Sequence, residues 1–207
     1  MIPMKITDFE EKKEEEEEKG IRQELEEKNY EEVEEMIENC ERCRLHENRK
    51  NAVPGEGPSN AKIMLIGEGP GKKEDEQGRP FVGSAGKKLD KCLEKAGINR
   101  EKIYITNTVK CRPPDNRDPL KDELRACHPY TEKLVELVDP DAVGLLGRIA
   151  SKRFLKIDSI TKNRGEKVEK NGRIYLPSFH PAALKYQPDR EPELVEDLRN
   201  LLEFVAD

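Results

Sequence analysis

The chain lacks tryptophan, carries few aromatic residues and contains no long apolar segment. Trp is absent from its 207 residues, and Phe, Trp and Tyr together account for 5% of them. No apolar run approaches the roughly 18 residues that mark a transmembrane helix, so we expect no membrane association. The N-terminus also lacks the apolar segment of a secretory signal. These absences predict a cytoplasmic protein.

Charge, in contrast, is abundant and unevenly distributed. Asp, Glu, Lys and Arg make up 40% of the chain, against about a quarter in an average globular protein. The net charge is −6, but residues 1–39 hold 6 basic and 16 acidic side chains, a net of −10. The rest of the chain, with 32 basic and 28 acidic side chains, carries +4. This mildly basic body permits DNA binding without requiring it.

The acidic residues 1–39 form an N-terminal extension ahead of a main domain, residues 40–207. Residues 1–20 are expected to be disordered because like charges dominate them. Residues 21–39 are predicted to form a helix that leads into the core. Apolar residues recur there at helical spacing: Tyr30, Val33, Met36 and Ile37. The extension is a candidate contact for a protein partner, or a segment that repels nonspecific DNA.

Short apolar runs alternate with helical stretches along the main domain. The four runs are 63–66, 103–105, 143–146 and 174–176. The predicted helices are 86–96, 120–137, 149–155 and 191–205. This alternation predicts an α/β fold with three layers, αβα, around a four-stranded parallel sheet. Ligands bind such sheets beyond the carboxyl ends of the strands. The segments to examine for chemistry are therefore 67–71, 107–114, 147–148 and 178–181.

The first of these segments reads GEGPG, at residues 67–71. Its glycines allow a tight turn and a close approach of the backbone to a ligand. The spacing matches neither of the two common phosphate-binding loops, and Glu68 would repel a phosphate. Glu68 instead suits a neutral or cationic partner or the activation of a water molecule. From the local sequence alone, a solvent-facing turn residue is an equally good interpretation.

Three further side chains near the strand ends have both a functional and a structural interpretation. Phe81 is a candidate stacking platform for a base, although a lone Phe more often belongs to the core. Asn107 offers the donor and the acceptor needed to recognise a nucleobase edge, or else it caps a turn. His180 could donate a hydrogen bond to a developing negative charge, or be structural.

Past His180, the apolar residues Leu184 and Tyr186 flank Lys185. This pattern is typical of a wedge that enters a DNA duplex, and Leu184 is the candidate wedge. The same residues could equally form the first turn of an amphipathic helix.

Four of the five cysteines have the pattern of a metal centre. Cys40 and Cys43 form a CxxC pair, and Cys111 and Cys127 follow later in the chain. Four thiolates suit either a tetrahedral zinc ion or an iron–sulfur cluster, and spacing alone does not separate the two. Cys92 falls on the apolar face of a predicted helix and is expected to be a buried structural residue.

Taken together, these segments resemble family 4 uracil-DNA glycosylases, the thermostable iron–sulfur members of the uracil-glycosylase superfamily. The resemblance runs from about Cys40 to Val205 and rests on motifs that agree in order and spacing: GEGPG, EDEQGRPFVGSAG, ITNTVKCRPPDNRDP, SFHPAAL and the four cysteines. Many Glu and Lys residues beside few Gln residues and no Trp also fit a thermophilic source.

The resemblance implies a monomeric enzyme that excises uracil from single- or double-stranded DNA and leaves an abasic site, which initiates base excision repair. Each implied role falls on a residue that matches a family motif. Glu68 would position or activate the attacking water, and the backbone at Gly69 would contact uracil. Phe81 would stack on the base, Asn107 would recognise its O4 and N3 edge, and His180 would stabilise charge on uracil O2. The four cysteines, 40, 43, 111 and 127, would hold a [4Fe–4S] cluster.

Two alternatives to this hydrolytic enzyme can be weighed on the sequence. A sister group bonds covalently to uracil through a histidine in an Arg-rich loop, but the comparable stretch here, ITKNRGEKVEK, has no histidine. Hydrolysis is therefore favoured. The second alternative is a non-catalytic iron–sulfur protein that binds DNA with the same fold.

Overall fold

The structure is a computed structural model that describes residue 16 and residues 18–205. Its centre is a five-stranded sheet in the order β2-β1-β3-β5-β4. The four parallel strands are β1 (Ile63–Gly67), β2 (Tyr104–Asn107), β3 (Ala142–Leu146) and β5 (Arg173–Ser178). They coincide with the four predicted apolar runs, so the predicted α/β class is confirmed. β1 and β3 are buried at every position, as expected for parallel strands covered on both faces.

The fifth strand, β4 (Val168–Lys170), corrects the predicted count of four. It pairs antiparallel with β5 at the edge of the sheet, so the sheet is mixed. The turn between the two strands is Asn171–Gly172, and both residues have positive φ, at 52° and 76°. An Asn-Gly pair favours the tight hairpin turn that such φ values produce. β4 is short, exposed and charged, so it lacks the apolar run by which the other strands were predicted.

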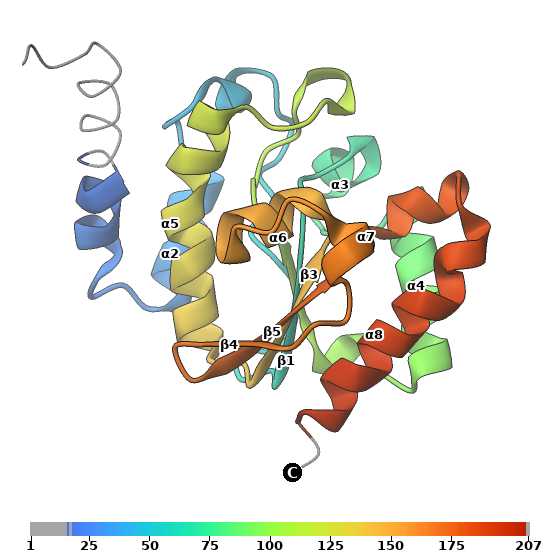
Figure 1. Cartoon of the computed structure of the whole chain (residues 1–207). Helices are drawn as coiled ribbons and strands as arrows, with labels where there is room; N and C mark the ends of the chain where they lie inside the picture. Colours follow the sequence, from blue (N-terminus) through green and yellow to red (C-terminus); the bar gives the residue numbers. More distant parts are fainter. Residues whose placement is uncertain (1–15, 17, 206–207) are drawn as a thin grey trace, which may run out of the picture.

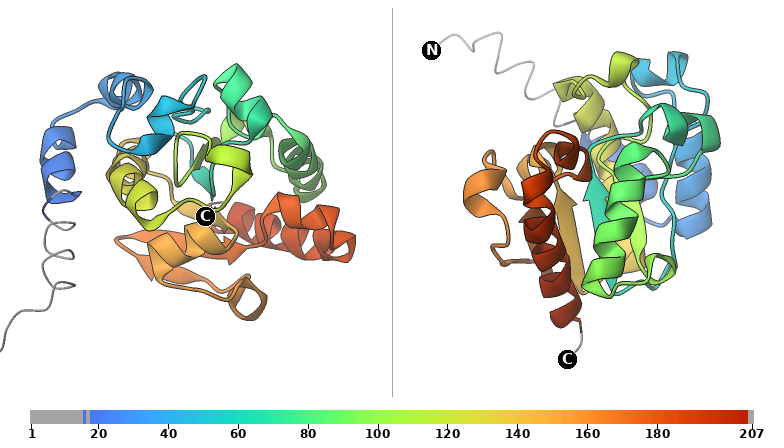
Figure 2. Two further views of the ribbon diagram at one scale, coloured as in Figure 1. Left: turned by 90° about the horizontal axis from the view of Figure 1, so that it is seen from above. Right: turned by 90° about the vertical axis from the view of Figure 1, so that its right-hand side faces the viewer.

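Helices cover both faces of the sheet, as Figures 1 and 2 show. α4 (Ser84–Ala96) and α8 (Glu191–Glu203) pack on one face, where they meet the alternate residues Ile63 and Leu65 of β1. α2 (Tyr30–Glu38), α5 (Lys121–Val138) and α6 (Arg148–Leu155) pack on the other. Two short helices, α3 (Lys72–Gln77) and α7 (Ile160–Asn163), complete the fold. The four predicted helices of the main domain are confirmed to within about two residues.

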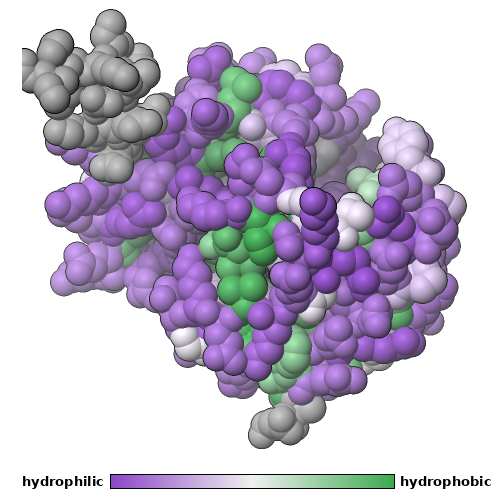
Figure 3. Space-filling view, viewed as in Figure 1, coloured by the Kyte–Doolittle hydropathy of each residue, from purple (hydrophilic) through white to green (hydrophobic). Residues whose placement is uncertain are grey.

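The surface of the molecule is strongly polar. Seen from the side of Figure 1, hydrophilic side chains cover most of the surface, and apolar side chains show only in scattered areas, the most prominent near the centre of the view (Figure 3). Among the described residues, the exposed large apolar side chains are Leu120, Tyr186 and Leu202. None of the described helices is both long and apolar enough to cross a membrane.

The N-terminal extension is packed against the domain over its described part. Residues 18–25 are helical, residues 26–29 form a break, and α2 then begins after Asn29, which caps it together with Glu32. The single helix predicted over residues 21–39 is therefore two helices, and residues 18–20 are helical where disorder was expected. The rest of the predicted disorder, residues 1–15 and 17, lies outside the described residues.

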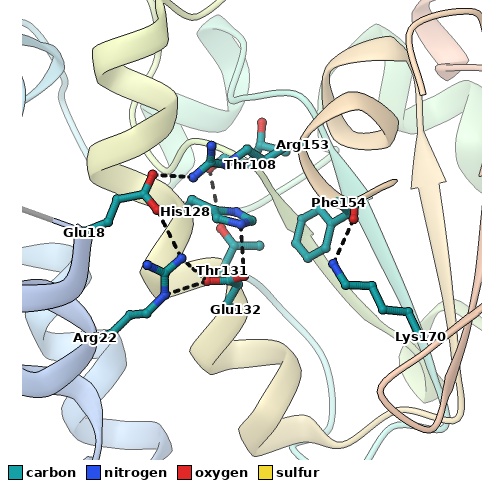
Figure 4. A network of polar contacts seen from close by, with 9 residues as sticks. All are labelled: Glu18, Arg22, Thr108, His128, Thr131, Glu132, Arg153, Phe154 and Lys170. Atoms are coloured by element: carbon teal, nitrogen blue, oxygen red, sulfur yellow. Dashed lines mark hydrogen bonds and ion pairs between the residues drawn. The ribbon is translucent and has the colours of Figure 1, made fainter. Parts of the chain in front are cut away.

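Two kinds of contact hold the first of these helices in place. Ile21 and Leu25 are buried in the same core as α2 and α5. Around them runs a chain of ion pairs (Figure 4). Glu18 pairs with Arg153 of α6 at 2.6 Å, and Arg22 pairs with Glu132 of α5 at 2.8 Å. The helix near the start of the described chain is thus tied to the domain by ion pairs of both polarities, one through Glu18 and one through Arg22.

Removal of the Leu25 side chain tests whether this helix belongs to the domain. Leu25 is 1% exposed, so Leu25→Ala should lower the free energy of unfolding by about 2–5 kcal/mol. Gln23→Ala, an exposed site on the same helix, should change it by less than about 0.5 kcal/mol. Guanidinium unfolding of the full chain measures both values. Equal stabilities of the two variants would mean that the helix contributes nothing to the folded domain.

Candidate functional site

An open cleft of about 560 Å³ lies beyond the carboxyl ends of the parallel strands. Five residues predicted from the sequence line it together: Glu68, Gly69, Phe81, Asn107 and His180. They come from four different segments of the chain. The register of the parallel strands brings these segments together, because β1 and β2 end side by side with Gly67 opposite Asn107.

Gly67, the last residue of β1, allows two of these side chains to meet. A Cβ atom at Gly67 would lie 2.5 Å from Oδ1 of Asn107 and 2.5 Å from Cζ of Phe81. Real Cβ atoms do not approach other atoms this closely, so any side chain here would push the Asn107 amide and the Phe81 ring out of position. The glycine is therefore required by the closeness of the two neighbouring side chains.

Phe81 is held in a strained backbone conformation. Its φ is 52°, which is uncommon for a bulky residue, and its side chain is only 5% exposed. The buried carboxylate of Glu74 accepts hydrogen bonds from the backbone N–H groups of Val82 at 3.0 Å and Gly83 at 2.8 Å. These bonds hold the turn in place. The Phe81 ring then lies 5.6 Å from the His180 ring, tilted by 35°. Phe81 is thus both a core residue and a wall of the cleft.

Asn107 has an unpaired polar atom in a buried position. Its side chain is 2% exposed, and Oδ1 has no hydrogen-bond partner. A buried acceptor without a donor costs about 1–3 kcal/mol, so most such atoms in folded proteins are paired. Because Asn107 lines the cleft, a ligand with an N–H group can supply the missing donor. This is the property expected of a residue that recognises a base edge.

His180 is held as a neutral hydrogen-bond donor. Its Nδ1 accepts a hydrogen bond from the backbone N–H of Ala182 at 3.2 Å, so the proton of the neutral ring is on Nε2. Burial lowers the pKa of His180 to about 4, which keeps the ring uncharged near neutral pH. A ring held in this way can donate from Nε2 to an acceptor atom.

Glu68 has a carboxyl group that titrates near neutral pH. Burial raises its pKa to about 7; the nearby Asp118 adds to the shift, and Arg148 opposes it. Arg148 and Asp118 pair with each other at 2.7 Å. A carboxylate with a pKa near the working pH is well suited to accept a proton from water.

Leu184 departs from its predicted role. It is 3% exposed and packs into the core beside α4 and α8, so it is not available to enter a duplex. The short helix Pro181–Lys185 turns it inward and leaves Tyr186 as the exposed side chain, at 77%. The Nζ atom of Lys185 lies 5.3 Å from the centre of the Tyr186 ring. The structure thus corrects the expectation that Leu184 faces DNA.

A second cavity is lined by all four predicted metal ligands. Cys40 and Cys43 follow α2, Cys111 follows β2, and Cys127 lies in α5, yet their side chains surround one small space. The other residues around it are mainly apolar: Ile37, Leu45, Val109, Ala126 and Tyr130. Cys92 lies in the core between the sheet and α4, away from this cavity, as expected.

Hydrogen-bond donors surround these thiols. Arg49 donates to Sγ of Cys111 at 3.2 Å, and the backbone N–H of Lys110 donates to Sγ of Cys127 at 3.3 Å. Burial raises the pKa of the Cys127 thiol to about 12, and a bound metal would favour its thiolate form. Within the described residues, no three Cys, His, Asp or Glu side chains could share one metal ion.

Two residues of the site had no signal in the sequence. Glu74 is one acidic residue in a charged helix, and Lys110 is one of many lysines. Their importance follows from burial, since Glu74 is 8% exposed and Lys110 is 2% exposed. The sequence showed only their positions within motifs, since Glu74 lies in EDEQGRPFVGSAG and Lys110 lies in ITNTVKCRPPDNRDP.

Comparison with known proteins gives a consistent result. The family described as the Uracil DNA glycosylase superfamily matches residues 54–203. The chain is 43% identical to a type-4 uracil-DNA glycosylase of Sulfurisphaera tokodaii, a match covering 84% of each chain. It is 45% identical to that of Saccharolobus solfataricus, over 82% of this chain and 83% of the relative. The protein of the same name from Thermotoga maritima is 42% identical, over 84% of this chain and 93% of the relative.

Proposed function

This chain belongs to the uracil-DNA glycosylase superfamily, and we propose that its cleft hydrolyses the N-glycosidic bond of a flipped-out deoxyuridine. The chain is a DNA glycosylase; it releases uracil, leaves an abasic site and thereby starts base excision repair. One observation carries the assignment of the site. Glu68, Phe81, Asn107 and His180 come from four separate segments of the chain but line a single cleft.

Base recognition is assigned to Asn107, Phe81 and the backbone at Gly69. The unpaired Oδ1 of Asn107 accepts the N3–H of uracil, and its amide N–H donates to O4. Cytosine is rejected because its N4 amine presents a donor where uracil O4 is an acceptor. Phe81 stacks on the base, which offsets part of the few kcal/mol that flipping costs. Gly69 allows the backbone to approach because it carries no side chain.

Bond cleavage is assigned to His180 and Glu68. As the bond breaks, negative charge grows on uracil and positive charge grows on the sugar. The Nε2–H of neutral His180 donates to uracil O2 and stabilises the leaving anion. The Glu68 carboxylate orients the water that attacks C1′ and accepts its proton. The proton therefore moves from water to Glu68, and uracil departs as an anion.

Contact with the duplex is assigned to the rim of the cleft. Lys72, Lys73 and Arg117 line it and can pair with phosphates. Because Leu184 is buried, the exposed Tyr186, four residues after the cleft residue Ala182, is the side chain of this segment that can stack against an unpaired base.

The four cysteines at the second cavity are assigned to a [4Fe–4S] cluster. Their donor set, the apolar lining and the surrounding N–H groups all suit a cluster in which each thiolate binds a different iron atom. The bound cluster would act as a cross-link between α5 and the loops that follow α2 and β2. Its role is thus to order the segments beside the DNA.

A uracil-release assay on single- and double-stranded DNA tests the function, and Asn107→Asp tests base recognition. Asp can accept from the cytosine N4 amine but repels uracil O4. We therefore expect the variant to release uracil about 10- to 100-fold more slowly and to release some cytosine. Asn116→Asp, in the same cleft, is the matched control and should do neither. DNA binding by the wild type without release of uracil would favour a non-catalytic binding protein instead.

The pH dependence of excision tests the role of Glu68. Activity needs the ionised carboxylate, whose pKa is about 7, so kcat/KM should rise about tenfold per pH unit below pH 7 and level off above it. His180 stays neutral above pH 4 and adds no second step in this range. Glu68→Gln should excise uracil slowly, and its kcat/KM should not rise with pH in this way. A wild-type profile that is flat from pH 5 to 9 would contradict proton transfer to Glu68.

Iron analysis tests the cluster. We expect about four iron atoms per chain in protein purified without oxygen. Cys127→Ser should lose iron, because it removes a ligand, whereas Cys92→Ala should retain it. A zinc-containing wild type, or equal iron contents in the two variants, would overturn the assignment.

A further inference from the structure

Lys110 lies between the two sites and touches both. It follows β2, its side chain is only 2% exposed, and it lines the cysteine cavity. On its other side, its Nζ donates to the backbone carbonyl oxygen of Asn107 at 2.5 Å. It also donates to Oγ1 of Thr106 at 2.7 Å and Oγ1 of Thr131 at 3.0 Å. All three N–H donors of the ammonium are therefore used.

The charge of this ammonium has no carboxylate partner. Its three acceptors are neutral, and in the part of the chain that the structure describes no ion pair involves Lys110. A buried cation without a counter-charge is costly. The thiols of Cys111 and Cys127 line the same cavity as Lys110. A metal cluster held by four thiolates is anionic, and it would provide the counter-charge.

Lys110 contacts Asn107, the residue assigned to base recognition. The Asn107 side chain has no internal hydrogen bond through Oδ1, so its orientation depends on its backbone. That backbone carbonyl accepts from Lys110 and also from Thr131 of α5, at 3.3 Å. The same helix carries Cys127, four residues before Thr131. A short path therefore leads from the cysteine cavity to the recognition amide.

We propose that Lys110 is a positioning residue that couples the metal-binding cavity to base recognition. Its ammonium holds the Asn107 backbone in the orientation that presents the amide to uracil, and the anionic cluster stabilises the ammonium. This inference rests on the proposed function. It adds a residue that acts through Asn107 and gives the cluster an electrostatic role besides cross-linking.

The test replaces Lys110 by Met, which keeps the length and removes the charge and the three donors. Lys110→Met should lower kcat/KM for uracil excision about 10- to 100-fold. It should also lower the ratio of kcat/KM for uracil to kcat/KM for cytosine, while the iron content stays near that of the wild type. Loss of a nearby positive charge should shift the cluster reduction potential to a more negative value. Lys133→Met is the matched control. Lys133 is also buried, in α5, but bonds to Glu26 and Glu136 away from the cleft, and its loss should change none of these values.

A double variant shows whether Lys110 acts through Asn107. In an Asn107→Ala background there is no amide to position, so adding Lys110→Met should cause no further loss of uracil excision. Additive losses in the double variant would overturn the proposal. The proposal would also be overturned if Lys110→Met discriminated between uracil and cytosine as well as the wild type does and kept the wild-type reduction potential of the cluster.

A second variant covers the case in which Lys110→Met does not fold. Thr131→Val removes one acceptor of Lys110 and one donor to Asn107 but keeps the charge. Thr131→Val should lower the ratio of kcat/KM for uracil excision to that for cytosine excision. Thr131→Ser, which keeps the hydroxyl, should have a ratio close to that of the wild type. Equal ratios in these two variants would contradict the proposed path. The wild type serves as the separate check, because its failure to release uracil would reject the proposed function rather than this coupling.

Discussion

The cleft depends on the close approach of β1 and β2 at their carboxyl ends. Gly67 and Asn107 face each other there in parallel register, and only a glycine leaves room for both the Asn107 amide and the Phe81 ring. The other features follow from this contact. Asn107 lines the cleft with its buried Oδ1 unpaired, and Phe81 is held beside it in a strained conformation by the buried Glu74. The strain and the unpaired acceptor both cost stability, and both are located where the base is expected to bind.

Burial sets the proton state of the two groups assigned to bond cleavage, and it acts on them in opposite directions. It disfavours the charged form of each group, so it lowers the pKa of His180 to about 4 and raises that of Glu68 to about 7. His180 is thereby a neutral donor, and Glu68 can take up a proton near neutral pH. A single physical cause produces the acid–base division of labour on which the proposed hydrolysis relies.

The sequence predicted elements and motifs well where the signal was local. The four parallel strands were recognisable because strands buried on both faces are continuous apolar runs, and the main helices were recognisable from their periodicity. The edge strand β4 was missed because it is short and charged, although its Asn171–Gly172 turn is a hairpin signal. The acidic extension was expected to be disordered up to residue 20 and helical from residue 21. Residues 18–20 are instead part of the helix 18–25, which is tied to the domain by Arg153 and Glu132, partners that lie more than a hundred residues away in the sequence.

The sequence by itself determined the family resemblance, the α/β class and five of the residues that line the cleft, because each of these depends on residue type and spacing along the chain. Only the tertiary structure decided which of those side chains are exposed or buried. It placed Leu184 in the core and Tyr186 at the surface, and it brought Lys110 between the cysteines and Asn107. These outcomes depend on the packing of β2 against α5 and of the Pro181–Lys185 helix against α4. Contacts between segments far apart in sequence leave no periodic pattern from which burial could be inferred.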